Sequence, residues 1–271
     1  MDYYRISAQK LGEGSKIPIV KLNETGEVYY ELALEMTRII EANNAAHKRT
    51  VMIVPVGPTG HYSIFVRLVE QNRISLKDCW FINMDEYLAD GDEWMPLDNP
   101  LSFRRFMNEE VYSRISEELL MPVSQKIFPD PHDLGRIPSL ITELGGVDLC
   151  IAGMGINGHV AFNEPEPELT PEEFAKLKTR IVDISPQSRT TNAVSALGGA
   201  LDAMPKRCVT IGMWEILSSR IIRFGCFRNW HSGALRKAAY GDVSSGFPGT
   251  LLQRHPNALI YASGNAVKQP F

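Results

Sequence analysis

The sequence predicts an α/β protein with a doubly wound, mostly parallel sheet and helices on both faces, in a three-layer α/β/α arrangement. Short apolar runs alternate with amphipathic runs, and no internal repeat or low-complexity tract interrupts them. Most of the apolar runs are continuous, as expected of strands that are covered on both faces. About a helix's length of chain separates successive runs, which is typical of βαβ units.

The first predicted helix is EVYYELALEMTRIIEANN, from Glu27, where apolar residues recur at helical spacing and two asparagines mark the end. The first strand, TVMIVPVG from Thr50, is rich in β-branched residues, and a second helix, SIFVRLVEQN, follows it. A second strand, DCWFINM, ends at Met84. The later strands are VDLCIAG from Val147, TRIVDIS from Thr179, KRCVTIGM from Lys206, RIIRFGCF from Arg220 and ALIYAS from Ala258.

Composition narrows the function classes. The chain has 271 residues, of which 44% are hydrophobic and 22% charged, so it can bury a sizeable core as one large domain or two small ones. The net charge of −4 argues against a large nucleic-acid surface but is compatible with a local basic cluster for a small anion. No signal-peptide pattern and no apolar run of ~18 residues occurs, which argues against membrane insertion.

The four cysteines show no CxxC pair and no zinc-type spacing with histidine. Cys79, Cys150 and Cys208 lie in apolar runs, where a reduced cysteine behaves as a small buried hydrophobe. We therefore expect a cytoplasmic protein without a metal centre.

Ligands of doubly wound sheets bind beyond the carboxyl ends of the strands, so the loops there carry the candidate site. The first strand runs into GPTGHYS, with Gly57, Thr59 and Gly60 before a helix. Backbone N–H groups of such a loop can bind a phosphate, but the loop can equally be an ordinary tight connection.

The second strand leads to Asp85 and Glu86, and we expect Glu86 to contact the substrate. Two adjacent acids are often a solvated turn, but a carboxylate at a strand end, partly screened from water, has the raised proton affinity of a general base.

The third strand leads into GMGINGHVAFNEP, the most unusual stretch of the chain. Gly155 and Gly158 permit positive φ angles and close approach of a ligand. His159 lies at the end of this loop, two residues after Asn157 and five residues before Glu164. An imidazole oriented by a carboxylate is a competent proton shuttle near neutral pH, so we expect Glu164 to orient His159.

Two further stretches suit an anion. QSRTTN places Arg189 after a strand, and RNWHSGALRKAAYG places Arg228, His231 and Ser232 just before a helix. Alone, such an arginine is more often a surface ion-pair partner.

The motifs INMDEYL, GMGINGHVAFNEP, SRTTN and FPGTLLQRHPNALI resemble the glucosamine-6-phosphate deaminase/isomerase family. That family is similar to the 6-phosphogluconolactonases through a G-x-G-x-[ND]-G-H element. The likeness covers about residues 27–260, and the FNEP and MDEY forms favour the deaminase branch.

The resemblance implies one domain of modified Rossmann type over residues 1–271. It also implies conversion of an amino-sugar phosphate to a ketose phosphate plus ammonia, without organic cofactor or metal. Asp85 would be the base that moves a proton between C2 and C1 of the opened sugar. His159, oriented by Glu164, would assist ring opening, and Asn157 would supply an uncharged contact where some members have aspartate. The glycines would make room for the sugar.

The match departs from the family at the phosphate site. The family loop T-G-G-T-P or S-G-x-T-P is rearranged to Gly57-Pro58-Thr59-Gly60-His61, and His231 stands where a lysine is expected. Either Arg189, Arg228, His61 and His231 rebuild the site, or the substrate is not the usual phosphate.

Two other activities fit part of the pattern. A lactonase-like hydrolase would use His159 to activate water, and a sugar-phosphate-sensing module would need no matched acid–base set. The substrate in the favoured interpretation is a glucosamine or galactosamine 6-phosphate. Family members range from monomers to hexamers, so a homo-oligomer is compatible with the sequence. The segment EPELTPEEFAKL (166–177) is expected to be either a lid or a plain surface helix with Thr170 at its start.

Overall fold

The computed structural model describes residues 2–271 and contains two sheets of different kind. The main sheet is parallel throughout, with the strand order β1 (Ile19–Lys21), β10 (Ala258–Ala262), β9 (Ser219–Cys226), β6 (Val147–Gly153), β2 (Thr50–Val54), β3 (Cys79–Asn83) and β5 (Lys126–Ile127). The smaller sheet is antiparallel, with the order β4 (Asp85–Tyr87), β8 (Arg207–Thr210) and β7 (Arg180–Asp183).

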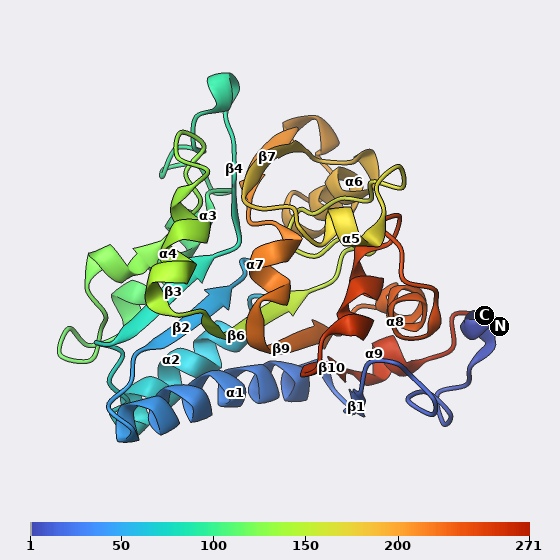
Figure 1. Ribbon diagram of the computed structural model, residues 1–271, viewed down its shortest axis with the longest axis horizontal. Coiled ribbons are helices and arrows are strands. Elements are labelled where there is room, and N and C mark those ends of the chain that lie inside the picture. Colours follow the sequence, from blue (N-terminus) through green and yellow to red (C-terminus); the bar gives the residue numbers. More distant parts are fainter. Residues whose placement is uncertain (1) are drawn as a thin grey trace.

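Helices cover both faces of the main sheet, as the sequence predicts. The α-helices of the described chain are α1 (Thr25–Ala45), α2 (His61–Asn72), α3 (Phe103–Glu110), α4 (Arg136–Leu144), α5 (Pro171–Phe174), α6 (Pro186–Ala196), α7 (Met213–Leu217), α8 (His231–Tyr240) and α9 (Gly264–Val267). In Figure 1, α1 and α2 run along one side of the main sheet, and α4 and α7 lie on the other side.

The residues of β2 show why the strands of the main sheet appear in the sequence as continuous apolar runs. Val51 and Ile53 pack into the core that α4, α7 and α8 share, whereas Met52 and Val54 pack into the core of α1 and α2. Successive strand side chains point to opposite faces, so both parities must be apolar when both faces are covered. The three-layer α/β prediction is therefore confirmed.

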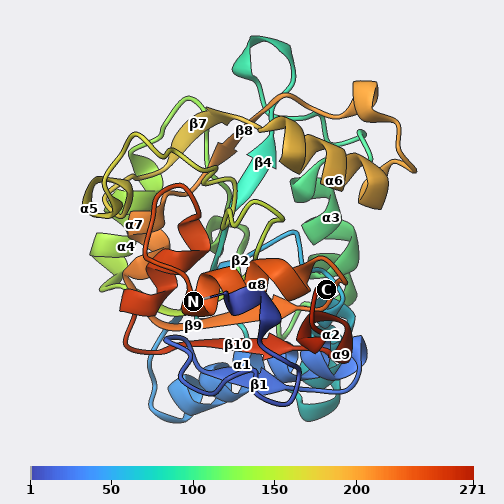
Figure 2. The ribbon, with the colours of Figure 1, turned by 90° about the vertical axis from the view of Figure 1, so that its right-hand side faces the viewer.

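Two of the strands predicted for the parallel sheet belong to the smaller, antiparallel sheet. The runs from Thr179 and Lys206 form β7 and β8, which pair antiparallel with each other and, through β8, with β4 in the smaller sheet. Figure 2 shows this sheet standing above the main sheet, with α3 and α6 beside it. A short apolar run looks the same in either kind of sheet, because partner and direction depend on contacts distant in sequence.

Arg236 of α8 connects both ends of the chain to this helix. Its fully buried guanidinium donates to the backbone carbonyls of Ile6, Ser232, Val267 and Lys268 at 2.9–3.0 Å. The charged group is thus solvated by peptide oxygens in place of water. The segments before β1 and after β10 are in this way fixed to α8, whose first turn borders the cavity described below.

All four cysteines are buried as free thiols, as predicted for those in apolar runs. None of the helices in the described part of the chain has the length and apolar character needed to cross a bilayer.

Candidate active site

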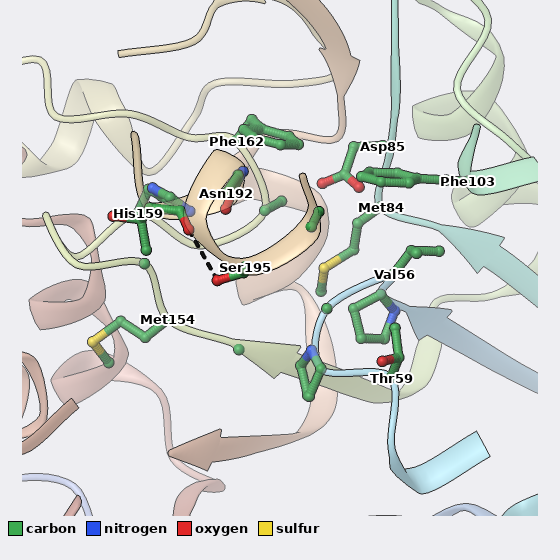
Figure 3. A pocket seen from close by; sticks show the side chains of 18 of the residues that line it. Val56, Thr59, Met84, Asp85, Phe103, Met154, His159, Phe162, Asn192 and Ser195 are labelled. Atoms are coloured by element: carbon green, nitrogen blue, oxygen red, sulfur yellow. Dashed lines mark hydrogen bonds between the residues drawn. The ribbon is translucent and has the colours of Figure 1, made fainter. Parts of the chain in front are cut away.

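A cavity of about 380 Å³ lies between the carboxyl ends of β2, β6 and β9 and the smaller sheet. Its walls come from the loops that follow these strands, from β4 and from α6. The position follows the rule for doubly wound sheets, and the volume falls within the roughly 300–1,000 Å³ of small-molecule sites. Figure 3 shows Asp85 and His159 on opposite sides of this cavity.

Asp85 opens β4, one residue beyond Met84, and only 6% of it is exposed. Among residues 2–271, no side chain or backbone group donates a hydrogen bond to its carboxylate. Burial raises the pKa of Asp85 well above its ordinary value, and the charge of Glu86 adds to this shift. The carboxyl group therefore faces the cavity with no protein donor and with a strong affinity for a proton.

Glu86, expected to bind substrate, lies outside the cavity lining. Neighbouring strand residues point to opposite faces, and the Glu86 carboxylate accepts hydrogen bonds from Ser102 Oγ at 3.0 Å and from the N–H groups of Phe103 and Arg104 at 2.9 Å. It caps the first turn of α3 and holds β4 against that helix. Glu86 is thus a support for Asp85 and for Phe103, which lines the cavity.

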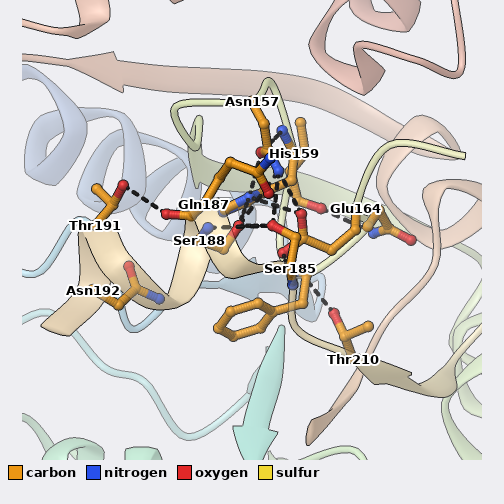
Figure 4. Close-up of polar contacts among 12 residues, drawn as sticks. Asn157, His159, Glu164, Ser185, Gln187, Ser188, Thr191, Asn192 and Thr210 are labelled. Carbon is orange, nitrogen blue, oxygen red and sulfur yellow. Dashed lines mark hydrogen bonds and ion pairs between the residues drawn. The ribbon is translucent and has the colours of Figure 1, made fainter. Parts of the chain in front are cut away.

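His159 is held through one ring nitrogen. Its Nδ1 lies 2.8 Å from Asn157 Oδ1 and 2.9 Å from Ser188 Oγ, at the N-terminal end of α6 (Figure 4). Nε2 makes no hydrogen bond with any group of the described chain, and the ring lines the cavity. Nε2 is therefore the nitrogen available for proton exchange with a ligand.

Glu164 lies beside the ring of His159, as the sequence predicted, but its shorter contact is with Asn157. Its Oε2 lies 3.7 Å from His159 Nδ1 and accepts a hydrogen bond of 2.6 Å from Asn157 Nδ2. Burial alone would raise the pKa of Glu164, but hydrogen bonds from His159, Ser188 and Asn157 and the proximity of His159 lower it to about 2. The carboxylate is ionised and acts on His159 mainly through the Asn157 amide.

The glycines of the central loop serve the protein itself. A Cβ at Gly155 would overlap the ring of His159, and Gly158 has φ +85° with the Phe247 ring where its side chain would be. Gly155 lines the cavity, but Gly158 does not. Gly158 thus makes room for Phe247 and not for the sugar, whereas Gly155 makes room for His159 and room for the sugar there stays a prediction.

The loop after β2 meets the cavity through Gly57 and Thr59. Gly60 is turned away, because the ring of Tyr29 occupies the place of a side chain there. His61 is fully buried in α2, both ring nitrogens lack a partner in the described chain, and burial lowers the pKa of His61 to about 3. It cannot serve as a phosphate-binding cation.

His231 lines the cavity but also cannot serve as a cation. Nδ1 accepts hydrogen bonds from the N–H groups of Phe227 and Arg228 at 2.8 and 2.9 Å, and Nε2 pairs with the Met154 carbonyl at 3.1 Å. Burial lowers the pKa of His231 to about 4, and the charge of Arg228 contributes to this lowering. The ring is a neutral brace between two loops, which corrects the expectation of a part-charged phosphate ligand.

Arg189 points away from the cavity, donating to the carbonyls of Leu201 and Met204. Of the four groups that could have rebuilt an anion site, only Arg228 lines the cavity with a permanent charge, and its side chain is exposed.

The cavity residues that sequence reasoning missed are mainly aromatic. Phe103, Tyr87 and Phe162 surround the Asp85 side, with ring centroids 4.7 Å apart for Tyr87–Phe103 and 5.6 Å apart for Tyr87–Phe162. Tyr87 and Phe162 lie in the MDEY and FNEP motifs, whereas no motif marks Phe103. Phe103 comes from a segment whose position depends on the smaller sheet.

The segment 166–177 is a fixed surface turn and helix. The Thr170 side chain caps α5, and Phe174 is fully buried. None of its residues lines the cavity. Of the two expectations, the plain capped helix agrees with the structure.

Comparison with known proteins gives a consistent result, although no family model matches the chain. A glucosamine-6-phosphate deaminase of Porphyromonas gingivalis is 30% identical over 239 residues, covering 82% of each chain. One from Geobacillus sp. (strain WCH70) is 28% identical over 247 residues, covering 88% of this chain and 92% of the relative.

Solved structures extend this likeness to the fold. A monomeric glucosamine-6-phosphate deaminase superimposes with a TM-score of 0.80 at 25% identity, covering 93% of this chain and 99% of that one. The 6-phosphogluconolactonase of Thermotoga maritima gives a TM-score of 0.63 at 17% identity, covering 90% of this chain and 98% of that one, a likeness of fold alone.

Proposed function

The chain belongs to the glucosamine-6-phosphate deaminase family, and on that premise we propose that it converts an amino-sugar 6-phosphate to a ketose 6-phosphate and ammonia. The observation that carries the proposal is the placement of Asp85 and His159 on opposite sides of one cavity. Glucosamine 6-phosphate and its galactosamine epimer are the substrates we expect.

His159 acts first in the proposed reaction. Nε2 exchanges a proton with the ring oxygen and the C1 hydroxyl, so that the cyclic sugar opens to the aldehyde. Nδ1 stays bound to Asn157 and Ser188 meanwhile, so the ring keeps its orientation as its charge changes.

Asp85 then moves a proton between carbons. Its carboxylate takes the proton from C2 and returns it to C1, while one proton passes from the ammonium group to the C1 oxygen. The aldehyde thereby becomes a C1 hydroxymethyl group and the ammonium-bearing carbon a C2 iminium group. Water adds to that iminium carbon and ammonia leaves. An amino sugar suits this base, because a nearby ammonium favours the ionised form of a carboxyl group whose pKa burial raises.

The phosphate of the substrate has one permanent cation available to it among the residues that line the cavity, Arg228. The hydroxyl of Thr59 and the backbone of the loop after β2 also line the cavity and can offer neutral hydrogen-bond donors to the phosphate. We therefore place the phosphate at this end, between the loops that follow β2 and β9.

Replacing Arg228 by Ala should raise KM for glucosamine 6-phosphate by roughly tenfold, because a charge-assisted hydrogen bond to an exposed partner is worth about 1.5 kcal/mol. The kcat should change little, since the phosphate is remote from the reacting carbons. Steady-state kinetics of R228A beside R73A, which removes an exposed arginine at the end of α2, checks this. An unchanged KM in R228A would place the phosphate elsewhere.

The function itself is tested by incubating the protein with glucosamine 6-phosphate, galactosamine 6-phosphate and 6-phosphogluconolactone. We expect ammonia and ketose phosphate from at least one amino sugar. Release of acid from the lactone alone would identify a lactonase, and tight binding of a sugar phosphate without turnover would identify a sensor.

The remaining expectations belong to this proposal. A cytoplasmic location is supported by the four unpaired, buried thiols, which are typical of proteins from reducing compartments. Assembly of the chain with copies of itself is to be measured by light scattering, and no nucleic-acid partner is expected from the negative net charge.

A further inference from the structure

Ser188 lies where the helix that forms one wall of the cavity meets the catalytic histidine. It is 1% exposed, and its N–H donates to Ser185 Oγ at 3.2 Å in the cap of α6. Its hydroxyl oxygen is 2.9 Å from His159 Nδ1. The residue is 29 positions away from His159 in the sequence, where it is the first residue of the SRTTN motif.

The hydrogen bonds around Ser188 fix which nitrogen of His159 carries the proton. Asn157 Nδ2 donates to Glu164 at 2.6 Å and to Ser185 Oγ at 3.1 Å, so the amide oxygen faces the ring. The Ser185 hydroxyl donates to Ser188 Oγ at 3.0 Å, so Ser188 also presents a lone pair to the ring. Two acceptors at Nδ1 require that Nδ1 hold the hydrogen.

The same helix carries both this support and the cavity wall. Thr191, Asn192, Ser195 and Ala196 of α6 line the cavity, about one to two turns after Ser188. Asn192 also donates to the Tyr87 hydroxyl at 3.2 Å, which ties α6 to β4 next to Asp85. The orientation of His159 therefore depends on α6 being docked in the position that completes the cavity.

We propose that Ser188 is a positioning residue for the deaminase reaction: with Asn157 it fixes His159 as the Nδ1–H tautomer, and it links that orientation to the docking of α6. This inference rests on the proposed function for its kinetic consequence but not for its structural one. When α6 is docked, Nε2 is left unprotonated and ready to accept the first proton from the sugar.

The structural consequence is tested without any substrate. Protein labelled with ¹⁵N-histidine gives separate signals for protonated and unprotonated ring nitrogens, and H159Q assigns the His159 pair among the six histidines. The free wild-type protein should show protonated Nδ1 and unprotonated Nε2. In S188A we expect both signals to move toward an average of the two tautomers, whereas unchanged signals would overturn the proposal.

The kinetic consequence uses the same variant. S188A should lower kcat by about tenfold while KM stays within about twofold, because proton transfer at His159 is affected and substrate contacts are kept. S188T, which keeps the hydroxyl, should restore most of the activity. T190A, whose exposed hydroxyl lies on the same helix and outside the cavity, should match the wild type.

A double variant separates positioning from loss of packing. If Ser188 and Asn157 act on the same proton, S188A/N157A should be no worse than the more damaging single variant. Multiplied effects, or equal losses in S188A and T190A, would contradict the proposal. A protein with no deaminase activity at all would refute the proposed function, while the ¹⁵N signals of S188A would still decide the role of Ser188.

Discussion

The Asp85→Asn variant should release ammonia at least about 10²–10⁴-fold more slowly than the wild type, the usual contribution of a general base. The amide has nearly the same shape as the carboxyl group but cannot accept a proton from carbon. KM should change less than kcat, because the cavity keeps its volume and its other walls. Steady-state assays of ammonia release measure both effects.

The same variant should be more stable than the wild type above about pH 4. Asp85 has a raised pKa in the folded protein, so the unfolded chain binds fewer protons and the wild type loses stability as pH rises through the unfolded pKa of about 3.9. The amide that replaces the carboxyl group does not titrate. Urea unfolding should therefore show an advantage for D85N at neutral pH that disappears below the unfolded pKa, and a destabilised D85N at neutral pH would contradict the burial of an unpartnered carboxyl group.

The Arg236→Met variant should lose about 3–5 kcal/mol of unfolding free energy, the range expected when a buried polar network is broken. Methionine fills much of the space of the arginine stem but leaves the carbonyls of Ile6, Val267 and Lys268 without the guanidinium donor. Each unpaired buried carbonyl costs about 1–3 kcal/mol before relaxation. For a chain of this size the loss corresponds to a fall of roughly 10 °C in Tm.

Arg73→Met is the matched control, because Arg73 pairs with Glu118 on the surface and both side chains are more than half exposed. It should unfold at the same urea concentration as the wild type. If Arg236→Met also unfolds there, the N-terminal and C-terminal segments are not held as the structure indicates. Activity of Arg236→Met below its unfolding range should be only moderately reduced, since Arg236 lies behind the first turn of α8.

The sequence was most informative where local pattern and position in the fold coincide. The continuous apolar run of β2 could be assigned to the middle of a parallel sheet because both of its faces are buried. The rule that ligands bind beyond the strand ends then brought Asp85 and His159 to one cavity. These inferences need no knowledge of side-chain direction.

The direction of each side chain and its hydrogen-bond partners could not be predicted from the sequence. Glu86 and Asp85 are neighbours, yet strand geometry sends one to the α3 cap and the other to the cavity. Arg189 and His231 have residue types that suit phosphate, but their partners are backbone groups brought close by the tertiary fold. Ser188 opens the SRTTN motif, but the motif does not say what its hydroxyl contacts, and only its distance from His159 indicates a role.

In the proposed reaction, Asp85 exchanges protons with the carbons of a bound sugar. Fructose 6-phosphate incubated with the protein and ammonium in deuterium oxide tests it directly, by following the C1 proton signal with NMR. One C1 proton should be lost steadily with the wild type and none with D85N. Loss at equal rates with both proteins, or no loss with an active wild type, would contradict it.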